Sequence, residues 1–291
     1  MIKHLLRLSD LTIKQINDII DLAIAYKNKK KTLPDLSKYL VANIFLESST
    51  RTHYSFLAAQ QNLKCKILDF ASLTSSMNKG ETFYDTCKTF VAMGANAIVC
   101  RSSQNQWYKE VLPLDVHLIN AGDGTLDHPT QTLLDLMTIK EHFHKFNGLN
   151  VAIVGDIVHS RVAHSNIDVM KRLGMNVYIC APKELQDKKY KYVEFDKIIH
   201  KLDVINLLRI QNERLEQTLQ ISLSDYNKQY GLSTPRLNKT KTKCIIIHPA
   251  PFNRNVEIND DCVEHKKSKI FTQITNGVFI RMAVLNLILN K

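Results

Sequence analysis

The amino-acid sequence predicts an α/β protein built from two doubly wound, mostly parallel sheets. Eight short apolar segments alternate with longer amphipathic segments, which is the pattern of strands and crossover helices in parallel sheets. The short segments form two groups of four, before about residue 125 and after about residue 148. The predicted strands are residues 41–47, 64–70, 96–101, 116–122, 150–156, 176–181, 203–208 and 244–249.

Helical patterns open and close the chain and join its two halves. Residues 11–27 and 277–291 read as the first and last helices. The amphipathic stretch 128–146 predicts a joining helix at about 130–145, and Asn147-Gly148 is a typical helix end. The predicted first domain therefore covers residues 1–130 and is completed by a terminal helix at 272–291. The second domain covers 131–271, with 131–147 as the linking helix.

Length and composition agree with a globular protein of two domains. The chain has 291 residues, of which 44% are hydrophobic and 23% charged, so disorder is not expected. No apolar run approaches the roughly 20 residues that cross a bilayer. The N-terminal segment is too polar for a secretory signal. We therefore expect a cytoplasmic protein with no membrane partner.

The chain is basic, with 39 Lys and Arg against 28 Asp and Glu, a net charge of +11. Such an excess can indicate nucleic acid, anionic lipid or small anionic substrates as binding partners. Much of it lies in short runs at 27–31, 183–191 and 265–269, which are typical of solvated faces. No nucleic-acid-binding motif accompanies these runs. A non-catalytic anion-binding or nucleic-acid-binding protein therefore remains only as the second hypothesis.

The six cysteines show no metal-binding or disulfide pattern. They form no CxxC pair and no Cys/His cluster with zinc spacing. Several lie inside apolar runs, such as the one that ends at Cys100. We therefore expect buried free thiols and no metal site.

Polar segments follow several predicted strands in both halves, where ligands of open α/β sheets bind. These segments are 47–52, Arg101, 122–128, 156–161, 209–214 and 248–254. A cleft between the two domains is the simplest arrangement that would bring them together. We therefore expect the active site in such a cleft.

Residues 45–56 lead from a strand into a helix and form a candidate phosphate site. Ser49 or Thr50 can cap the helix, whose first-turn N–H groups and dipole attract anions. Arg51 can add a bidentate contact, and Thr52 a further hydroxyl. The same residues fit an ordinary capped helix start. The chain has no GxGxxG or GxxxxGK[ST] motif, so nothing supports a nucleotide site.

Seven motifs in a fixed order make the chain resemble the aspartate carbamoyltransferase family, above all its homotrimeric catalytic chains. They are STRT at 49–52, KGET at 79–82, Arg101 after a strand, AGDGTLDHPTQ at 121–131, GDIVHSR at 155–161, LLRIQNER at 207–214 and HPAP at 248–251. The resemblance implies carbamoyl transfer from carbamoyl phosphate to the amino group of L-aspartate, in de novo pyrimidine biosynthesis. It implies no metal and no organic cofactor. The first domain would bind carbamoyl phosphate and the second aspartate.

The resemblance also implies a role for each matching residue. Ser49, Thr50, Arg51 and Thr52 would bind the phosphate of carbamoyl phosphate. Arg101 would contact the phosphate and the carbonyl oxygen, and His128 would donate to that oxygen. Gln131 would hold the carbamoyl amide, together with backbone of Pro249, Ala250 and Pro251. Arg161 would bind the α-carboxylate of aspartate, and Arg209 and Gln211 its side-chain carboxylate and amino end. The residues expected to act in catalysis are Arg51, Thr52, Lys79, Arg101 and His128.

Ser75 and Lys79 lie in the loop that, in this family, reaches the active site of a neighbouring subunit. The resemblance therefore implies a homotrimer with shared active sites. It leaves open whether a regulatory subunit or dihydroorotase joins the assembly.

Other interpretations remain for single residues and for the substrate. An isolated arginine is most often a surface ion-pair partner, His128 could cap a helix, Lys79 could be solvated, and Gln211 could lie on a helix surface. The nearest rival is an ornithine carbamoyltransferase. Its cationic substrate would not favour Arg209, and that family reads HCLP in place of HPAP and lacks the KGET-type lysine. The chain departs from the family's frequent residues at His53, Ser102, Ser103, Leu126, Asp127, Phe252 and Asn255.

Overall fold

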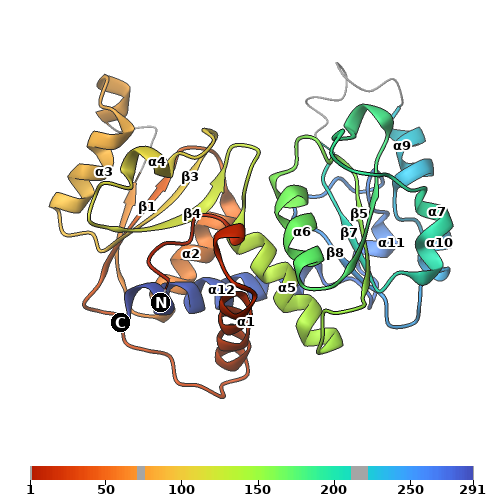
Figure 1. Ribbon diagram of the computed structural model, residues 1–291, viewed down its shortest axis with the longest axis horizontal. Helices are drawn as coiled ribbons and strands as arrows, with labels where there is room; N and C mark the ends of the chain where they lie inside the picture. Colours follow the sequence, from red (N-terminus) through yellow and green to blue (C-terminus); the bar gives the residue numbers. More distant parts are fainter. Residues whose placement is uncertain (1, 71–75, 211–221, 291) are drawn as a thin grey trace. The chain divides into compact units, whose positions relative to one another are not determined.

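The computed structural model describes residues 2–70, 76–210 and 222–290. The chain forms two compact units (Figure 1). Unit 1 comprises Met1–Met137 with Ile274–Lys291, and unit 2 comprises Thr138–Gln273. Each unit holds one parallel four-stranded sheet with helices packed against it, which confirms the predicted fold class.

The sheet of unit 1 has the strand order β2-β1-β3-β4. Its strands are β1 (Leu40–Phe45), β2 (Lys66–Phe70), β3 (Ala97–Ser102) and β4 (His117–Asp123). The connecting helices are α2 (Thr50–Asn62), α3 (Phe83–Ala92) and the short α4 (Tyr108–Val111). The chain passes from β1 to β2 on one side of it, and then crosses to β3 on the other side of β1. The topological switch point, where open α/β sheets bind ligands, therefore lies between the ends of β1 and β3.

The pleat of this sheet divides its core between two helical layers. Alternate residues such as Ala42, Ile98 and Cys100 belong to a buried cluster with residues of α3 and α4 and with Trp107, which directly precedes α4. On α2, Gln60 and the β1 residue Asn43 exchange two buried hydrogen bonds of 2.7 and 2.9 Å. Because successive strand residues point to opposite faces, α2 covers the face opposite to α3 and α4.

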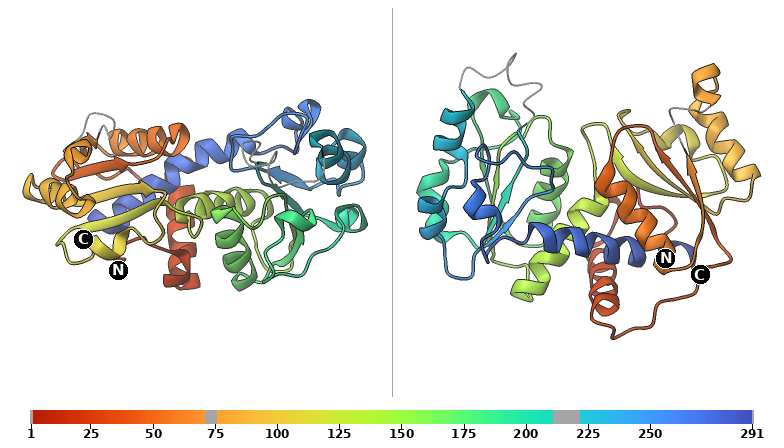
Figure 2. Two further views of the ribbon diagram at one scale, coloured as in Figure 1. Left: turned by 90° about the horizontal axis from the view of Figure 1, so that it is seen from above. Right: turned by 180° about the vertical axis from the view of Figure 1, so that it is seen from behind.

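Two terminal helices complete unit 1. The helix α1 (Ile13–Lys27) begins with a reciprocal capping box between Thr12 and Gln15. The last helix, α12 (Ile270–Leu289), lies beside α1 and α2 in both views of Figure 2. By length and composition α12 could cross a membrane, but 61% of its most apolar stretch is buried inside the protein, as in an ordinary core helix.

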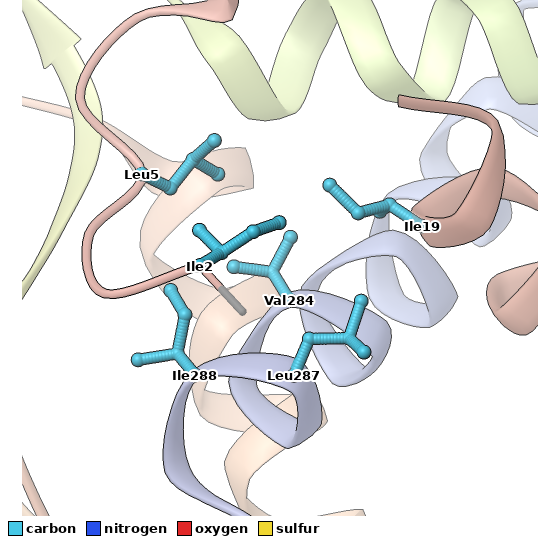
Figure 3. A pocket seen from close by; sticks show the side chains of 6 residues that line it. All are labelled: Ile2, Leu5, Ile19, Val284, Leu287 and Ile288. Carbon is cyan, nitrogen blue, oxygen red and sulfur yellow. The ribbon is translucent and has the colours of Figure 1, made fainter. Parts of the chain in front are cut away.

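An apolar hollow marks where α12 packs on the N-terminal segment and α1. Figure 3 shows its lining side chains, which are all aliphatic: Ile2, Leu5, Ile19, Val284, Leu287 and Ile288. The hollow has no room for the centre of a water molecule. Leu5 also forms a parallel bridge with Ile119, which ties the N-terminal segment to β4. This region therefore belongs to the packed core of unit 1.

Unit 2 repeats the topology of unit 1, with the strand order β6-β5-β7-β8. Its strands are β5 (Asn150–Val154), β6 (Asn176–Cys180), β7 (Val204–Leu207) and β8 (Ile245–Ile247). Its helices are α6 (Arg161–Arg172), α7 (Phe195–Ile198), α9 (Leu223–Tyr230), α10 (Thr234–Asn238) and α11 (Asp260–Val263). In the described parts of the chain, 3₁₀ turns lie at Leu8–Asp10 and Ser76–Lys79 in unit 1 and at Lys183–Leu185 and Ile199–Lys201 in unit 2. The switch point of this second sheet lies between the ends of β5 and β7.

The predicted strands are confirmed, since each lies within two residues of its expected start and within two of its expected end. The predicted end of the joining helix at Asn147-Gly148 is wrong. The helix α5 runs from Pro129 to Phe143, and His144 follows with a φ of 58°. This left-handed conformation, which histidine adopts more often than most residues, ends the helix early. Gly148, with a φ of 78°, instead turns the chain into β5.

Candidate active site

Arg101 and Glu47 form an ion pair at the switch point of unit 1. Arg101 is the penultimate residue of β3, and Glu47 lies just beyond the end of β1. The Arg101 Nε lies 2.6 Å from the Glu47 Oε1, and the two side chains are only 16% and 24% exposed. Ser102, the departure next to Arg101, is buried and accepts a hydrogen bond from the Gln104 N–H at 3.0 Å. The switch point thus presents a cation that a carboxylate holds in place.

The start of α2 lies next to this ion pair. Ser49 occupies the N-cap position, but its hydroxyl accepts no hydrogen bond from the first turn, so the expected side-chain cap does not form there. Thr50 and Arg51 are exposed, whereas Thr52 is buried. The N–H groups of this first turn can therefore serve an anion, which the helix dipole also attracts.

His128 lies directly before α5 and contacts Thr52 at the start of α2. Its Nε2 lies 3.5 Å from the Thr52 Oγ1, and both side chains are buried. Its carbonyl accepts the N–H of Gln131 at 3.0 Å, which begins the helix. The Gln131 side chain donates to the Asp135 Oδ1 at 2.9 Å. The loop before His128 is held by Asp123, whose carboxylate accepts the Asp127 N–H at 2.8 Å.

The KGET segment combines one exposed lysine with residues that have local structural roles. Thr82 caps α3 by accepting the Asp85 N–H at 3.1 Å, and Glu81 accepts the Thr86 hydroxyl at 2.7 Å. Lys79 ends a 3₁₀ turn and is exposed. The structure thus brings Ser49, Thr50, Arg51, Thr52, Arg101, His128 and Gln131 to one end of the unit 1 sheet. Ser75 lies outside the described residues.

The switch point of unit 2 carries two more of the expected arginines. Arg161 is the first residue of α6, where Ser160 caps the helix by accepting the Ala163 N–H at 3.1 Å. Arg209 follows β7 by two residues, and both arginines are partly buried. Gly155 has a φ of 131°, and a Cβ there would lie 3.0 Å from the Leu208 Cβ. Glycine therefore allows the ends of β5 and β7 to approach closely.

A buried polar network links the HPAP segment to the residues beside Arg209. The His248 Nδ1 accepts the Ala250 N–H at 2.8 Å, and the His248 Nε2 lies 3.4 Å from the Glu257 Oε1. The same Glu257 oxygen accepts the Asn253 N–H at 2.6 Å. The Asn253 side chain donates to the Ile210 carbonyl at 2.7 Å. Backbone around Pro249, Ala250 and Pro251 is therefore fixed to the segment that carries Arg209, while Gln211 lies outside the described residues.

Two departures from the family's frequent residues have a physical account here. Asn255 stands where glycine is frequent, and its φ of 61° is a conformation that asparagine tolerates better than most residues. His53, on α2, lies 2.6 Å from the Asp69 Oδ1 through its Nε2. The imidazole at this position thus has a carboxylate partner on β2.

Glu47, Asn253 and Glu257 were given no role from the sequence, although each contacts an expected site residue or its loop. Glu47 ends the predicted strand 41–47 and begins the polar segment 47–52, which was a usable signal. Glu257 lies in an ordinary polar stretch, and its 1% exposure could not be read from sequence.

The six cysteines are buried free thiols, as the apolar runs around them predict. All six thiols are free and buried, and burial raises the pKa of Cys87 and of Cys180 to about 12. In the described part of the chain, no group of three or more His, Cys, Asp or Glu side chains is arranged to hold a metal ion.

Both halves of the chain match family models. Residues 3–141 match the carbamoyl-P binding domain of aspartate/ornithine carbamoyltransferases, and residues 147–288 match the Asp/Orn binding domain. Among curated relatives, the aspartate carbamoyltransferase catalytic subunit of Malacoplasma penetrans is 50% identical, with 98% of this chain and 96% of that protein covered. The subunit of the same name from Staphylococcus epidermidis is 44% identical, with 99% of each covered.

Solved structures agree with these relatives. Aspartate transcarbamoylase from Trypanosoma cruzi, in complex with carbamoyl phosphate, has a TM-score of 0.90 at 28% identity, covering 97% of this chain and 94% of that one. The catalytic subunit from M. jannaschii has a TM-score of 0.87 at 31% identity, covering 99% and 98%. The chain therefore belongs to the aspartate/ornithine carbamoyltransferase family.

Proposed function

We propose that this protein is an aspartate carbamoyltransferase, which transfers the carbamoyl group of carbamoyl phosphate to the amino group of L-aspartate. The products are N-carbamoyl-L-aspartate, a precursor in de novo pyrimidine biosynthesis, and phosphate. The observation that carries the proposal is the pair of cationic switch points, one in each sheet. Arg101 lies at the first, and Arg161 and Arg209 lie at the second. This division matches one phosphorylated substrate and one dicarboxylic substrate.

The unit 1 residues suit the carbamoyl donor. The open first turn of α2 and the exposed Arg51 offer donors for a phosphate, as do Ser49, Thr50 and Thr52. Thr52, Arg101 and His128 bring hydroxyl, guanidinium and imidazole donors to the same end of the sheet, where they can bind the carbonyl oxygen. Gln131 lies one helical turn beyond His128 and is proposed to hold the carbamoyl amide. We therefore assign Met1–Met137 with the terminal helix to carbamoyl phosphate.

The unit 2 residues suit the acceptor. Arg161 at the start of α6 is proposed to bind the α-carboxylate of aspartate. Arg209, with Gln211, is proposed to bind the side-chain carboxylate and the amino end. The buried His248–Glu257–Asn253 network holds the backbone of Pro249, Ala250 and Pro251 in register with this segment. Each of the two carboxylates of the substrate would thus bind its own guanidinium group.

The chemistry needs positioning and charge stabilisation more than a covalent nucleophile. The neutral amino group of aspartate attacks the carbamoyl carbon, and a C–N bond forms as negative charge grows on the carbonyl oxygen. The bond from carbon to the phosphate oxygen then breaks. Thr52, Arg101 and His128 stabilise the oxyanion, while Arg51, Lys79 and the start of α2 stabilise the departing phosphate. The phosphate can accept the proton that the amine loses.

We also propose a cytoplasmic homotrimer in which neighbouring subunits share active sites. Lys79 supports this because it is exposed at the end of a 3₁₀ turn, and its own KGET neighbours are engaged in the start of α3. An exposed cation of this kind can reach a substrate bound to another chain. Ser75 of the same loop is proposed to act with it.

One assay separates this function from its rivals. Purified protein should form N-carbamoylaspartate from carbamoyl phosphate and L-aspartate, and N-(phosphonacetyl)-L-aspartate should inhibit it. L-ornithine should give no product, because its cationic side chain would face Arg209. Carbamoylation of ornithine in preference to aspartate would assign the chain to the other branch of the family. Salt-sensitive binding to RNA or DNA without any carbamoyl transfer would favour the non-catalytic hypothesis.

A further inference from the structure

Arg281 is a buried arginine in the middle of the apolar helix α12. It is only 2% exposed. Its guanidinium donates to the Gly277 carbonyl at 2.9 Å, the Ser55 hydroxyl at 3.1 Å and the Thr130 hydroxyl at 3.2 Å. It also lies 4.9 Å from the centre of the Phe56 ring. Every one of these partners is neutral, and among the described residues no carboxylate pairs with Arg281.

Arg236 in unit 2 shows how this chain otherwise buries an arginine. It is 7% exposed, and it forms two hydrogen bonds of 2.8 and 2.7 Å with the Asp196 carboxylate. It also donates to the carbonyls of Gln229 and Gly231 at the end of α9. A buried cation is normally compensated in this way. Arg281 has no such counter-ion in the described chain.

The electrostatic surroundings of Arg281 make its uncompensated positive charge still less favourable. Burial and, to a smaller extent, the positive charge of Arg101 together lower the pKa of the Arg281 guanidinium to about 9. The guanidinium therefore keeps its charge at neutral pH. Arg101 is the switch-point cation, so unit 1 holds two mutually repelling positive charges near its proposed substrate site.

The contacts of Arg281 lie directly behind that site. Ser55 and Phe56 follow Thr52 on α2 by about one turn, and Thr130 follows His128 by two residues. Arg281 therefore bridges the starts of α2 and α5, the two helices that carry the proposed phosphate and carbonyl donors. Gly277 makes room for it, since a Cβ there would lie 2.6 Å from the Arg281 Nη1.

We propose that Arg281 is a positioning residue of the carbamoyl phosphate site, and that the bound phosphate group supplies the counter-charge the protein lacks. Its hydrogen bonds to Ser55 and Thr130 fix the two helix starts relative to each other. Its charge acts on the phosphate through a poorly solvated interior, where charges interact over longer distances than in water. This inference rests on the proposed function and deepens its phosphate site.

The test uses Arg281→Met, with Arg236→Met as the matched control. Calorimetry would measure the affinity of the whole protein for inorganic phosphate and carbamoyl phosphate, and thermal unfolding would be recorded without ligand. Arg281→Met should weaken both affinities by at least about tenfold and raise the KM for carbamoyl phosphate, while the Tm without ligand stays equal or rises. The KM for aspartate at saturating carbamoyl phosphate should change by less than about twofold. Arg236→Met should do the opposite, with a lower Tm and unchanged phosphate affinity.

A lower Tm with unchanged phosphate affinity in Arg281→Met would overturn the inference, because it would show an ordinary structural arginine. Arg281→Lys and Arg281→Gln provide a second comparison if the Met variant does not fold. The charged Lys variant should keep phosphate affinity within about threefold of the wild type, and the neutral Gln variant should lose about tenfold. Equal affinities in these two variants would also overturn it. Failure of the wild type itself to bind carbamoyl phosphate would instead refute the proposed function, on which the inference depends.

Discussion

The Nε of Arg101 lies 2.6 Å from the Oε1 of Glu47, where two adjacent parallel strands end. The pairing has two opposite consequences for an anion that binds there. Glu47 fixes the direction of the Arg101 guanidinium, which favours a preorganised site. Its negative charge also repels a phosphate and occupies one face of the arginine. In the proposed site, Glu47 would therefore lower the affinity for the anion and at the same time fix the orientation of Arg101.

Glu47→Gln should separate these two effects. We expect inorganic phosphate to bind more tightly, by about threefold or more, because one nearby negative charge is removed. We expect kcat to fall, because the neutral amide holds Arg101 less firmly. Calorimetry and steady-state kinetics measure the two quantities. Asp35→Asn, which removes an exposed carboxylate paired with Lys64, is the control and should change neither. Weaker phosphate binding in Glu47→Gln would contradict the prediction.

Arg51→Ala and Arg101→Ala should each reduce turnover by about 10²–10³, the usual loss on removal of one oxyanion donor. The reason is that, in the proposed mechanism, both side chains act on charge that develops in the transition state. The measurement is kcat at saturating substrates, with the oligomeric state checked by gel filtration. Arg172→Ala is the control, because Arg172 lies at the opposite end of α6 from Arg161 and forms an ion pair with Asp168. Near-normal turnover in either active-site variant would defeat the assignment.

Lys79 and Arg51 should complement each other across subunits. Lys79→Ala and Arg51→Ala chains are each expected to be nearly inactive when assembled alone. Mixed trimers should regain activity, because some sites would combine an intact Lys79 from one chain with an intact Arg51 from another. The experiment denatures and reassembles the two variants together and assays carbamoyl transfer. Mixed assemblies of verified composition that stay inactive would argue against shared sites.

Glu257→Gln should impair aspartate use while leaving carbamoyl phosphate binding intact. Because the His248 Nδ1 accepts the Ala250 N–H, the neutral imidazole carries its proton on Nε2, facing Glu257. Loss of the carboxylate weakens this contact and the one to Asn253, and so loosens the Ile210 segment beside Arg209. We expect kcat/KM for aspartate to fall by about tenfold. Glu264→Gln, which changes an exposed carboxylate, is the control. Reduced stability with unchanged kcat/KM would leave the network a purely structural role.

The sequence predicted strands better than helix ends, and it assigned no role to several residues that contact the expected site residues. Strands such as Asn150–Val154 are short apolar runs, and burial on both faces of a parallel sheet requires that composition. The end of α5 was predicted wrongly because His144 adopts a left-handed backbone conformation that the local sequence pattern does not predict. Arg281 could have been noticed as a lone charge within an apolar helix. The lack of a counter-ion can be recognised only from the structure, because the hydrogen-bond partners Ser55 and Thr130 lie 226 and 151 residues away from Arg281 in sequence.

Asp196→Asn should destabilise unit 2 in a pH-dependent manner. The hydrogen bond from Arg236 holds the pKa of the Asp196 carboxyl below its ordinary value of 3.8. A carboxylate whose pKa is lowered by folding contributes stability at pH values above 3.8, and that contribution is lost as the pH falls through the folded value. Removing the charge leaves the buried Arg236 with only carbonyl partners. We expect a cost of about 1–2 kcal/mol at neutral pH, below the usual value for a fully buried pair because the Asp196 side chain is half exposed.

Urea unfolding followed by circular dichroism between pH 7 and about pH 3 measures this effect, at one protein concentration because association of the proposed subunits would also stabilise the fold. The difference between Asp196→Asn and the wild type should be constant at neutral pH and shrink below 3.8. Asp225→Asn is a useful comparison, because the Ser222 hydroxyl is the main cause that lowers the pKa of Asp225, and its cationic neighbour is the exposed Lys228. Its effect at neutral pH should therefore be smaller. A stability difference for Asp196→Asn that persists undiminished at pH 3 would show that packing, and not the ion pair with Arg236, accounts for the loss.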